Sequence, residues 1–440
     1  MKRVPGVSPG YSGPERPALA DLDLCTRCGL CEQACPTYRL LGFEPDSPRG
    51  RIFLMKQVAL GEAEINQHLA DHLYRCLGCR ACETVCPAGV PFGRLLEYGR
   101  FQVEQHRDLA PHSKGWMIFR QLAFRLVLPR RWLFRALMWP SRAIASVPGF
   151  AAAFDTLPRG NRLRRLVDML PRRDKHVEPS ASAMPPVTPA IGRRRAVVGL
   201  LLGCVMDSLF RHTHEATVRV LARNGCDVRV PTGQWCCGAL NVHAGERAIA
   251  KDLARANIDA FGRAPLDAII VNSAGCGAVM KEYGELLKDD SEYAQPALAF
   301  AARVKDVTEF LAETSLVSGF AKLPIAVTYQ DACHLVHGQG ISHQPRALLQ
   351  AIPGLRYIEL RNASQCCGAA GVYSLTHPHL AQAILDEKIE AVLETSADVV
   401  ATANPGCSMQ LQAGLAQRGS RMRVRHVVEI LDEAYAARSR

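Results

Sequence analysis

Two copies of one cysteine pattern restrict the fold of this chain more than any other feature. The pattern is C-x2-C-x2-C-x3-C-P, which reads CTRCGLCEQACP in the first copy and CLGCRACETVCP in the second. The two copies supply eight cysteines before residue 90, namely Cys25, Cys28, Cys31, Cys35, Cys76, Cys79, Cys82 and Cys86. Thiols clustered in this way indicate ligand sites, so the first part of the chain must fold in a way that brings them together.

This spacing is the one that supplies thiolates to [4Fe–4S] clusters. Three closely spaced cysteines can surround one cluster, while the fourth, which precedes proline, ligates the other cluster. The first cluster is therefore assigned the ligands Cys25, Cys28, Cys31 and Cys86. The second is assigned Cys76, Cys79, Cys82 and Cys35. Two structural zinc sites are the alternative, since they also use four cysteines with two-residue gaps, but the repeated short gap followed by Cys-Pro favours two [4Fe–4S] clusters.

Several other classes of protein are disfavoured by the sequence. A disulfide framework suits short secreted chains, whereas this chain has 440 residues, and its first ten residues lack the apolar run of a signal peptide. No run approaches the ~20 apolar residues that cross a bilayer. The best candidate, residues 116–140, is interrupted by five arginines. We therefore expect a cytoplasmic protein, with peripheral association with the cytoplasmic face of the inner membrane left open.

An internal duplication follows in the second half of the chain. Each copy has four cysteines with nearly constant offsets of 129, 130 and 131 residues: Cys204, Cys236, Cys237 and Cys276, then Cys333, Cys366, Cys367 and Cys407. In each copy, apolar strand-like runs precede the first and last cysteines, and a short strand precedes the adjacent pair. Strands that alternate with helices predict two α/β units with parallel sheets and with the cysteines where strands end.

Four cysteines per copy are enough to bind one further cluster or metal each. The alternatives are that the adjacent pairs are inert turn residues or a redox-active vicinal pair. Cys226 belongs to neither pattern and is expected to be a core residue.

The chain is thus expected to combine an α-helical module with two duplicated α/β domains. Residues 19–107 form a 2[4Fe–4S] ferredoxin-type domain, in which a helix within residues 48–64 links the two cluster sites. Residues 108–195 form a basic aromatic helical segment and a linker rich in Pro and Arg. Residues 196–322 and 323–440 form the two cysteine-rich domains.

The formal net charge of +11 suits an acidic partner, nucleic acid or an anionic membrane. No nucleic-acid motif is recognised, so no nucleic-acid partner is expected. The basic aromatic segment, residues 114–142, could lie on a membrane, dock a partner subunit or cover the ferredoxin-type domain. It could equally be an ordinary packed helix with a solvated basic side.

The C-terminal half resembles the cysteine-rich CCG domains found in heterodisulfide reductases and in iron–sulfur subunits of flavin-dependent 2-hydroxy-acid oxidases. That pattern has a fifth cysteine, where this chain has Val279 and Gln410. The complete set of five holds the noncubane cluster that performs disulfide chemistry in heterodisulfide reductase. Its absence here argues against that activity.

From about residue 19 onward the chain resembles the family of glycolate oxidase iron–sulfur subunits, through SPRGRIFLMK, DACHLVHGQGI, QCCGAAGVY and ATANPGC as well as the cysteines. The resemblance implies an electron-transfer subunit. A separate FAD-containing dehydrogenase subunit would oxidise glycolate to glyoxylate, and electrons would pass to a quinone or another acceptor. The alternatives are an iron–sulfur subunit of anaerobic glycerol-3-phosphate dehydrogenase or of a lactate dehydrogenase complex, and a catalytic subunit like that of heterodisulfide reductase.

No dinucleotide-binding or Walker motif stands at a convincing position, so the chain is not expected to bind flavin or nicotinamide. No residue of this chain is therefore assigned a catalytic role. His334, His337 and His343 follow Cys333 and could tune a cluster or protonate a quinone-like acceptor. The other interpretation is that they are polar loop residues near a strand end.

Overall fold

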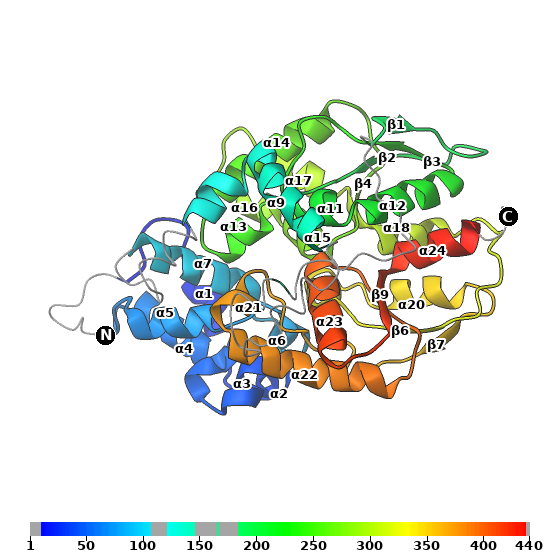
Figure 1. Ribbon diagram of the computed structural model, residues 1–440. Helices are drawn as coiled ribbons and strands as arrows, with labels where there is room; N and C mark the ends of the chain where they lie inside the picture. Colours follow the sequence, from blue (N-terminus) through cyan, green and yellow to red (C-terminus); the bar gives the residue numbers. More distant parts are fainter. Residues whose placement is uncertain (1–9, 107–120, 146–163, 165–166, 168–183, 437–440) are drawn as a thin grey trace.

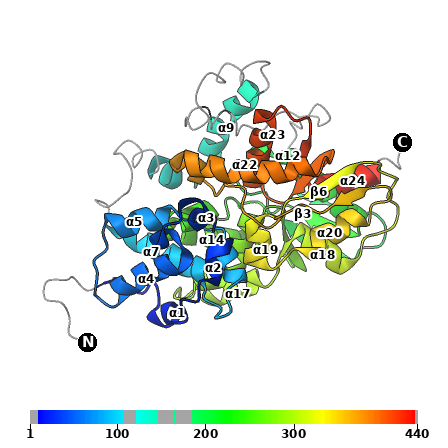
Figure 2. The same cartoon turned by 90° about the horizontal axis from the view of Figure 1, so that it is seen from below.

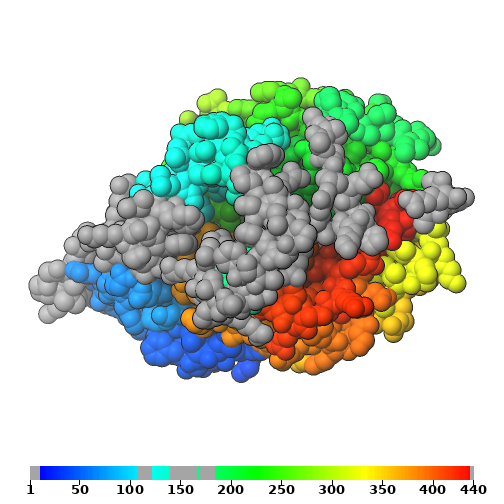
Figure 3. Space-filling view, viewed as in Figure 1, coloured from blue at the N-terminus to red at the C-terminus, as the bar shows by residue number. Residues whose placement is uncertain are grey.

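The computed structural model describes residues 10–106, 121–145, 164, 167 and 184–436. A helical N-terminal module lies beside two α/β units that are stacked on each other (Figure 1). The combination of a helical ferredoxin-type module and two duplicated α/β units confirms the predicted fold class. The three parts pack into one continuous body (Figure 3). Among the described residues, no helix has the length and apolar character needed to cross a membrane.

The N-terminal module consists of short helices around a small apolar core. Its elements are α1 (Leu19–Asp23), α2 (Leu30–Ala34), α3 (Pro36–Leu41), η1 (Glu44–Asp46), α4 (Pro48–Ala59), α5 (Gln67–Tyr74), α6 (Ala81–Thr84) and α7 (Phe92–Gln105). The helix expected between the two cysteine runs is α4. It begins where the Ser47 side chain accepts a hydrogen bond from Gly50 N and Pro48 fills the first turn, a strong start signal. Its Met55 side chain is fully buried, as are Leu73 of α5 and Leu95 of α7.

The first α/β unit contains a five-stranded sheet with the order β1-β3-β2-β4-β5. The strands are β1 (Val187–Thr188), β2 (Ala196–Leu200), β3 (Cys226–Arg229), β4 (Ala268–Val271) and β5 (Val304–Asp306). All pairings are parallel except that of β1 with β3, so the expected parallel sheet gains an antiparallel edge. The helices are α11 (Val205–Leu209), α12 (Arg211–Arg223), α13 (Ala239–His243), α14 (Arg247–Gly262), α15 (Ala274–Lys281), α16 (Tyr283–Leu286), α17 (Ala294–Ala301) and α18 (Val307–Thr314).

The second unit repeats this topology in a four-stranded parallel sheet with the order β7-β6-β8-β9. Its strands are β6 (Ala326–Tyr329), β7 (Arg356–Ile358), β8 (Val399–Thr402) and β9 (Arg423–His426). Its helices are α19 (Cys333–Gln339), α20 (His343–Gln350), α21 (Tyr373–Thr376), α22 (Pro378–Glu394), α23 (Pro405–Gln417) and α24 (Val427–Ala436). Strands β4, β6 and β8 are buried along their whole length, as parallel strands covered on both faces must be. The long helix α22 reaches the N-terminal module, where it contacts α3 (Figure 2).

The two α/β units pack reciprocally on each other. Helix α12 of the first unit contacts α24 of the second, and α18 of the first contacts α20 of the second. In the repeat, α12 is equivalent to α20, and α18 to α24, so the contact has the character of a two-fold interface. Buried Leu221, Leu311, Leu349 and Leu431 belong to one apolar cluster across it. Cys226 lies in the same cluster, 1% exposed, as a core residue.

The described part of the basic aromatic segment forms a short π-helix, η3 (Leu122–Val127), and α9 (Arg131–Ala145). It packs on the first α/β unit, where Phe124 and Phe134 are buried beside Trp235. The outer side exposes Trp132, which is 70% exposed, while Arg135 pairs with Asp207. A packed helix with a solvated side therefore describes the observed part better than a cover for the ferredoxin-type module. The remainder of the segment and most of the predicted linker lie outside the described residues.

Candidate cluster sites

The cysteines assigned to the first cluster lie around one small cavity at the edge of the helical module. Cys25, Cys28, Cys31 and Cys86 all line it, together with Cys82 and apolar side chains of α4 and α7. Cys28 is exposed and the other three of the set are partly exposed. The fold thus brings a cysteine of the second run to three cysteines of the first, at a place that a partner can approach.

The cysteines assigned to the second cluster are all buried, and they are Cys35, Cys76, Cys79 and Cys82. Their thiols lie close enough to influence one another, since burial first and then the neighbouring Cys79 and Cys76 raise the pKa of the Cys82 thiol. This set is therefore enclosed by protein, in contrast to the first.

Both cysteine loops turn through left-handed residues at equivalent positions. Gly29 and Gly78 have φ values of 84° and 67°, which glycine adopts readily. Arg27 and Arg80 also have positive φ values, of 60° and 64°. A side chain in this region costs roughly 1–2 kcal/mol. Arg80 is held there by ion pairs with Glu83 (2.9 Å) and with a carboxylate of the first α/β unit (2.6 Å). The loops wrap their cysteines at the expense of backbone strain.

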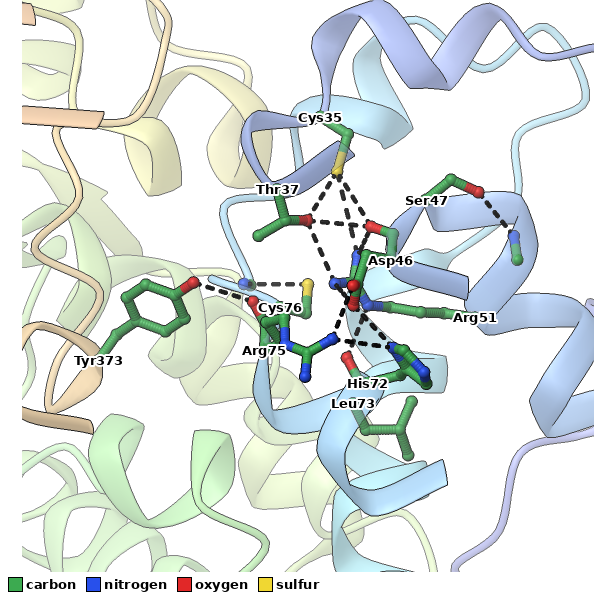
Figure 4. Close-up of polar contacts among 12 residues, drawn as sticks. Cys35, Thr37, Asp46, Ser47, Arg51, His72, Leu73, Arg75, Cys76 and Tyr373 are labelled. Carbon is green, nitrogen blue, oxygen red and sulfur yellow. Dashed lines mark hydrogen bonds and ion pairs between the residues drawn. The ribbon is translucent and has the colours of Figure 1, made fainter. Parts of the chain in front are cut away.

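A buried ionic network lies directly against the second set (Figure 4). The Asp46 carboxylate is 0% exposed and accepts from His72 Nδ1 (2.8 Å), Arg75 Nη1 (2.7 Å) and Arg51 Nη2 (3.3 Å). Burial is the largest influence on His72 and lowers its pKa, so its ring is neutral at pH 7. Sequence reasoning missed this network, because nothing in the pattern distinguishes Arg51 from a solvated arginine.

The eight C-terminal cysteines line one shared cavity of about 280 Å³. They come from both units: Cys204, Cys236, Cys237 and Cys276 from the first, and Cys333, Cys366, Cys367 and Cys407 from the second. In each unit the first and last of these follow the carboxyl ends of the two central strands, where α/β sheets place ligands. The duplicated sites therefore face each other across one space rather than lying on separate surfaces.

The glycine after each adjacent pair has a defined structural role. Gly238 and Gly368 have φ values of 82° and 84°, and a Cβ on Gly368 would lie 2.7 Å from a carbonyl oxygen of α22. The backbone N–H of each donates to the first sulfur of its pair at 3.4 Å, a bond that favours thiolate. Hydrogen bonds from Cys366 and Cys407 also lower the pKa of the Cys367 thiol. The glycine of the CCG sequence thus lets the loop that carries the cysteine pair approach the following helix closely.

The second set adjoins the shared cavity. Cys76 lines this cavity together with the C-terminal cysteines. Buried Cys79 and partly buried Cys333 belong to one packed cluster, so thiols of the second set and of the shared cavity lie side by side. Buried Arg100 donates to the carbonyl oxygens of Cys76 (2.6 Å) and His243 (2.9 Å), fixing the helical module on the first α/β unit. The three thiol groups therefore form a continuous series from the surface to the shared cavity.

Backbone N–H groups point at the thiols in both kinds of site. Gly78, Gly238 and Gly368 each donate to a cysteine sulfur at 3.4 Å. Hydrogen bonds to the sulfurs are among the features that tune iron–sulfur clusters. The Cys204 and Cys236 sulfurs lie 3.6 Å apart. Within the described ranges, no group of three or more Cys, His, Asp or Glu side chains is arranged to hold a single metal ion.

The positions of the missing fifth cysteines differ in chemistry. Val279 is 3% exposed in the apolar core of the first unit. Gln410 lies one turn after Cys407 in α23, is 0% exposed, and neither polar atom of its carboxamide has a hydrogen-bond partner among the described residues. Neither residue lines the shared cavity.

The three histidines after Cys333 lie on helices, so the interpretation as loop residues is wrong. Only His334 lines the shared cavity. Burial lowers its pKa to about 3, and its Nε2 lies 3.0 Å from Gly78 O. Its ring faces that of His243 at 5.1 Å, and His243 Nδ1 is held by Glu97 at 3.0 Å. His243 was not among the predicted residues, because no cysteine pattern leads to it.

Comparison with known proteins gives matches over nearly the whole chain. Residues 21–90 match the family model of a 4Fe-4S dicluster domain, and residues 198–281 and 327–412 each match that of a cysteine-rich CCG domain. The chain is 39% identical over 430 residues to the "Probable glycolate oxidase iron-sulfur subunit" of Bacillus subtilis (strain 168), which covers 96% of this chain and 95% of the relative. It is 36% identical over 418 residues to the "Glycolate oxidase iron-sulfur subunit" of Escherichia coli (strain K12), or 94% of each chain. "Lactate utilization protein A" of an Exiguobacterium species is 32% identical over 237 residues, 54% of this chain and 97% of that protein.

Proposed function

We propose that this chain, which belongs to the family of glycolate oxidase iron–sulfur subunits, carries electrons from the oxidation of glycolate to an acceptor. It is the electron-transfer subunit of an oxidoreductase complex. The observation that carries the proposal is the continuous series of thiol groups from exposed Cys28, through the buried set, to the shared cavity. When bound, each [4Fe–4S] cluster supplies a centre that gains or loses one electron.

The cysteines have distinct proposed roles along this series. The first cluster would be held by Cys25, Cys28, Cys31 and Cys86, where exposure lets a donor approach. The second would be held by Cys35, Cys76, Cys79 and Cys82, where burial excludes water from the path. The C-terminal cysteines would hold one or two further clusters around the shared cavity. Domain limits at 19–107, 196–322 and 323–440 remain our proposal for how these sites are divided.

Oxidation of glycolate to glyoxylate takes place, in this proposal, on a separate flavoprotein subunit. The chemistry-bearing residues of this chain are thiols arranged to bind clusters, which carry single electrons. Hydride transfer from the substrate is therefore assigned to the flavin of the other subunit. The partner carries FAD and docks near Cys28, since that is the exposed end of the series.

The acceptor is proposed to be a quinone, with the chain held on the cytoplasmic face of the inner membrane. The support is the outer side of η3 and α9, which exposes Leu122, Trp132 and Leu137 by 51%, 70% and 50% among arginines. Apolar side chains among cationic ones suit an anionic lipid surface.

The test is to purify the chain anaerobically with its co-expressed flavoprotein and to measure iron, sulfide, and acceptor reduction. Glycolate, lactate and glycerol 3-phosphate are the three substrates. We expect at least two cubane EPR signals and reduction of the acceptor with glycolate. Activity with glycerol 3-phosphate alone would replace the substrate, while zinc without sulfide would overturn the function itself.

A further inference from the structure

Two arginines of the sequence PRGR have opposite surroundings although they are two residues apart in α4. The Arg49 side chain is 30% exposed and is shared by Glu32 (2.6 Å) and Glu44 (2.7 Å). Its Nη1 donates to Arg27 O at 3.1 Å, in the loop of the first cysteine set. The Arg51 side chain is 0% exposed and lies against the second set. Each cysteine set therefore has one arginine of this pair beside it, one partly exposed and one buried.

All five N–H groups of Arg51 are used. Its Nε donates to His72 O (2.8 Å), and its Nη1 donates to Asp46 O and points at Cys35 Sγ (4.0 Å). Its Nη2 donates to Thr37 Oγ1 (3.2 Å) and to Asp46 Oδ1 (3.3 Å). Figure 4 shows these contacts converging from α3, η1 and α5. A guanidinium with five partners cannot rotate away from the thiols, so its charge is fixed in position.

The charges around the second set sum to a positive value. Asp46 supplies the single carboxylate of the network, whereas Arg51 and Arg75 supply two guanidinium groups and His72 is neutral. Arg100, which is 7% exposed, adds a further cation at the Cys76 carbonyl. At the first set, Arg27 and Arg49 are balanced by the carboxylates of Glu32 and Glu44. The second set therefore has the more positive surroundings.

A cluster becomes more negative by one charge when it accepts an electron. A cation stabilises that charge far more strongly in water-free surroundings than at the surface, where solvent screens it. The geometry points to Arg51 as the residue that holds the reduction potential of the buried cluster above that of the exposed one, so that electrons pass inward from the first set to the second. This inference rests on the proposed function and deepens it.

The transfer that Arg51 directs balances simply. One electron would leave the cluster held by the first set, which would be oxidised, and would reach the cluster held by the second, which would be reduced. No bond forms or breaks, and no proton is needed. The Arg51 guanidinium carries its charge throughout, because arginine is not deprotonated in proteins. Arg51 is a positioning residue for charge, not a catalytic residue.

The test is an EPR-monitored redox titration of the whole chain, purified anaerobically, with iron content measured for each variant. A Cys28→Ser variant assigns the signal of the first cluster. In Arg51→Gln we expect the ratio of reduced to oxidised second cluster, at a fixed potential, to fall at least tenfold, equal to a midpoint lower by about 59 mV for one electron. Arg49→Gln is the matched control and should change either midpoint less than half as much. Arg51→Lys keeps the charge and should also shift the midpoint less than half as much as Arg51→Gln.

Unchanged midpoints in Arg51→Gln with full iron content would overturn the inference while leaving the proposed function intact. An equal shift in Arg51→Lys would also overturn it, because hydrogen bonding and not charge would then be responsible. If Arg51→Gln does not retain iron, Arg75→Gln takes its place. That side chain is 30% exposed, so its loss should lower the same midpoint by less, and an unchanged or raised midpoint there would refute the role of charge. Absence of both EPR signals in the unsubstituted chain would instead remove the proposed function.

Discussion

Replacing Asp46 by Asn should loosen the helical module far more than a carboxylate on its surface would. The substitution keeps the size of the side chain but removes the only carboxylate that pairs with Arg51 and Arg75 among the described residues. Leaving a buried charge without its partner costs about 3–5 kcal/mol. The Arg75 side chain is 30% exposed, so water screens the Arg75–Asp46 ion pair and reduces its contribution to this cost. The lower end of the range therefore applies. A loss of about 3 kcal/mol corresponds to about a 100-fold increase in local opening.

The measurement is amide hydrogen exchange by mass spectrometry on the cluster-loaded chain, because local opening is defined even where a large protein does not unfold in one step. Peptides from α4 and α5 should lose about 100-fold of their protection, while those from α24 keep theirs. The matched control is Asp23→Asn, which removes an exposed ion pair with Lys56 (2.6 Å) and should change protection by less than about fivefold. A change below fivefold in Asp46→Asn would refute the view that the network holds this module together.

Three further predictions concern the clusters and the α/β units. Cys25→Ser should abolish electron delivery to the acceptor in the assembled complex while flavin reduction by substrate continues, and stopped-flow absorbance separates these two steps. The control Cys226→Ser, at a core position, should leave electron delivery intact. Gly368→Ala should lower the thermal midpoint and the iron content, because the new Cβ would lie 2.7 Å from a carbonyl oxygen. Gly419 has the same left-handed backbone but lies in open space, so Gly419→Ala should have a smaller effect on both quantities. Burial lowers the pKa of His426 to about 4, so its contribution to stability is complete above pH ~6.5 and is lost as the pH falls. At pH 5 the free energy of unfolding should be lower by about 2 kcal/mol from this group. The fall of the thermal midpoint with pH should be weaker in His426→Gln.

Local patterns predicted the parts of this protein that depend on nearby residues. The apolar runs that precede Cys204, Cys276, Cys333 and Cys407 correspond to β2, β4, β6 and β8, and the periodic residues between the cysteine runs correspond to α4. These elements follow from side-chain alternation, helical spacing and start signals, which act over a few residues. The left-handed conformation of Arg27 and Arg80 was not predictable in the same way, because it is imposed by the shape of the thiol loops and not by the residue type.

Burial of individual charges could not be predicted from the sequence. Arg49 and Arg51 have the same local context, and both would be placed in water by a count of charged residues. Arg51 is buried because five hydrogen-bond acceptors lie within its reach. Asp46 supplies two of them, and His72, which is 21 residues away in sequence, Thr37 and Cys35 supply one each. The position of the described part of the basic aromatic segment likewise depends on Trp235, which is about a hundred residues from Phe124 and Phe134 in sequence.

The meeting of the two C-terminal sites in one cavity follows from the duplication once the packing is known. Each unit carries its cysteines on loops at the carboxyl ends of parallel strands, and a single unit would expose them. The reciprocal pairing of α12 with α24 and of α18 with α20 brings the two loop ends to one cavity, which Cys76 of the helical module also lines. A duplicated unit therefore gains what one copy lacks, a single space lined by eight thiols and adjacent to the second ferredoxin-type set. That juxtaposition is what would let electrons pass from the ferredoxin-type sets to the last sites.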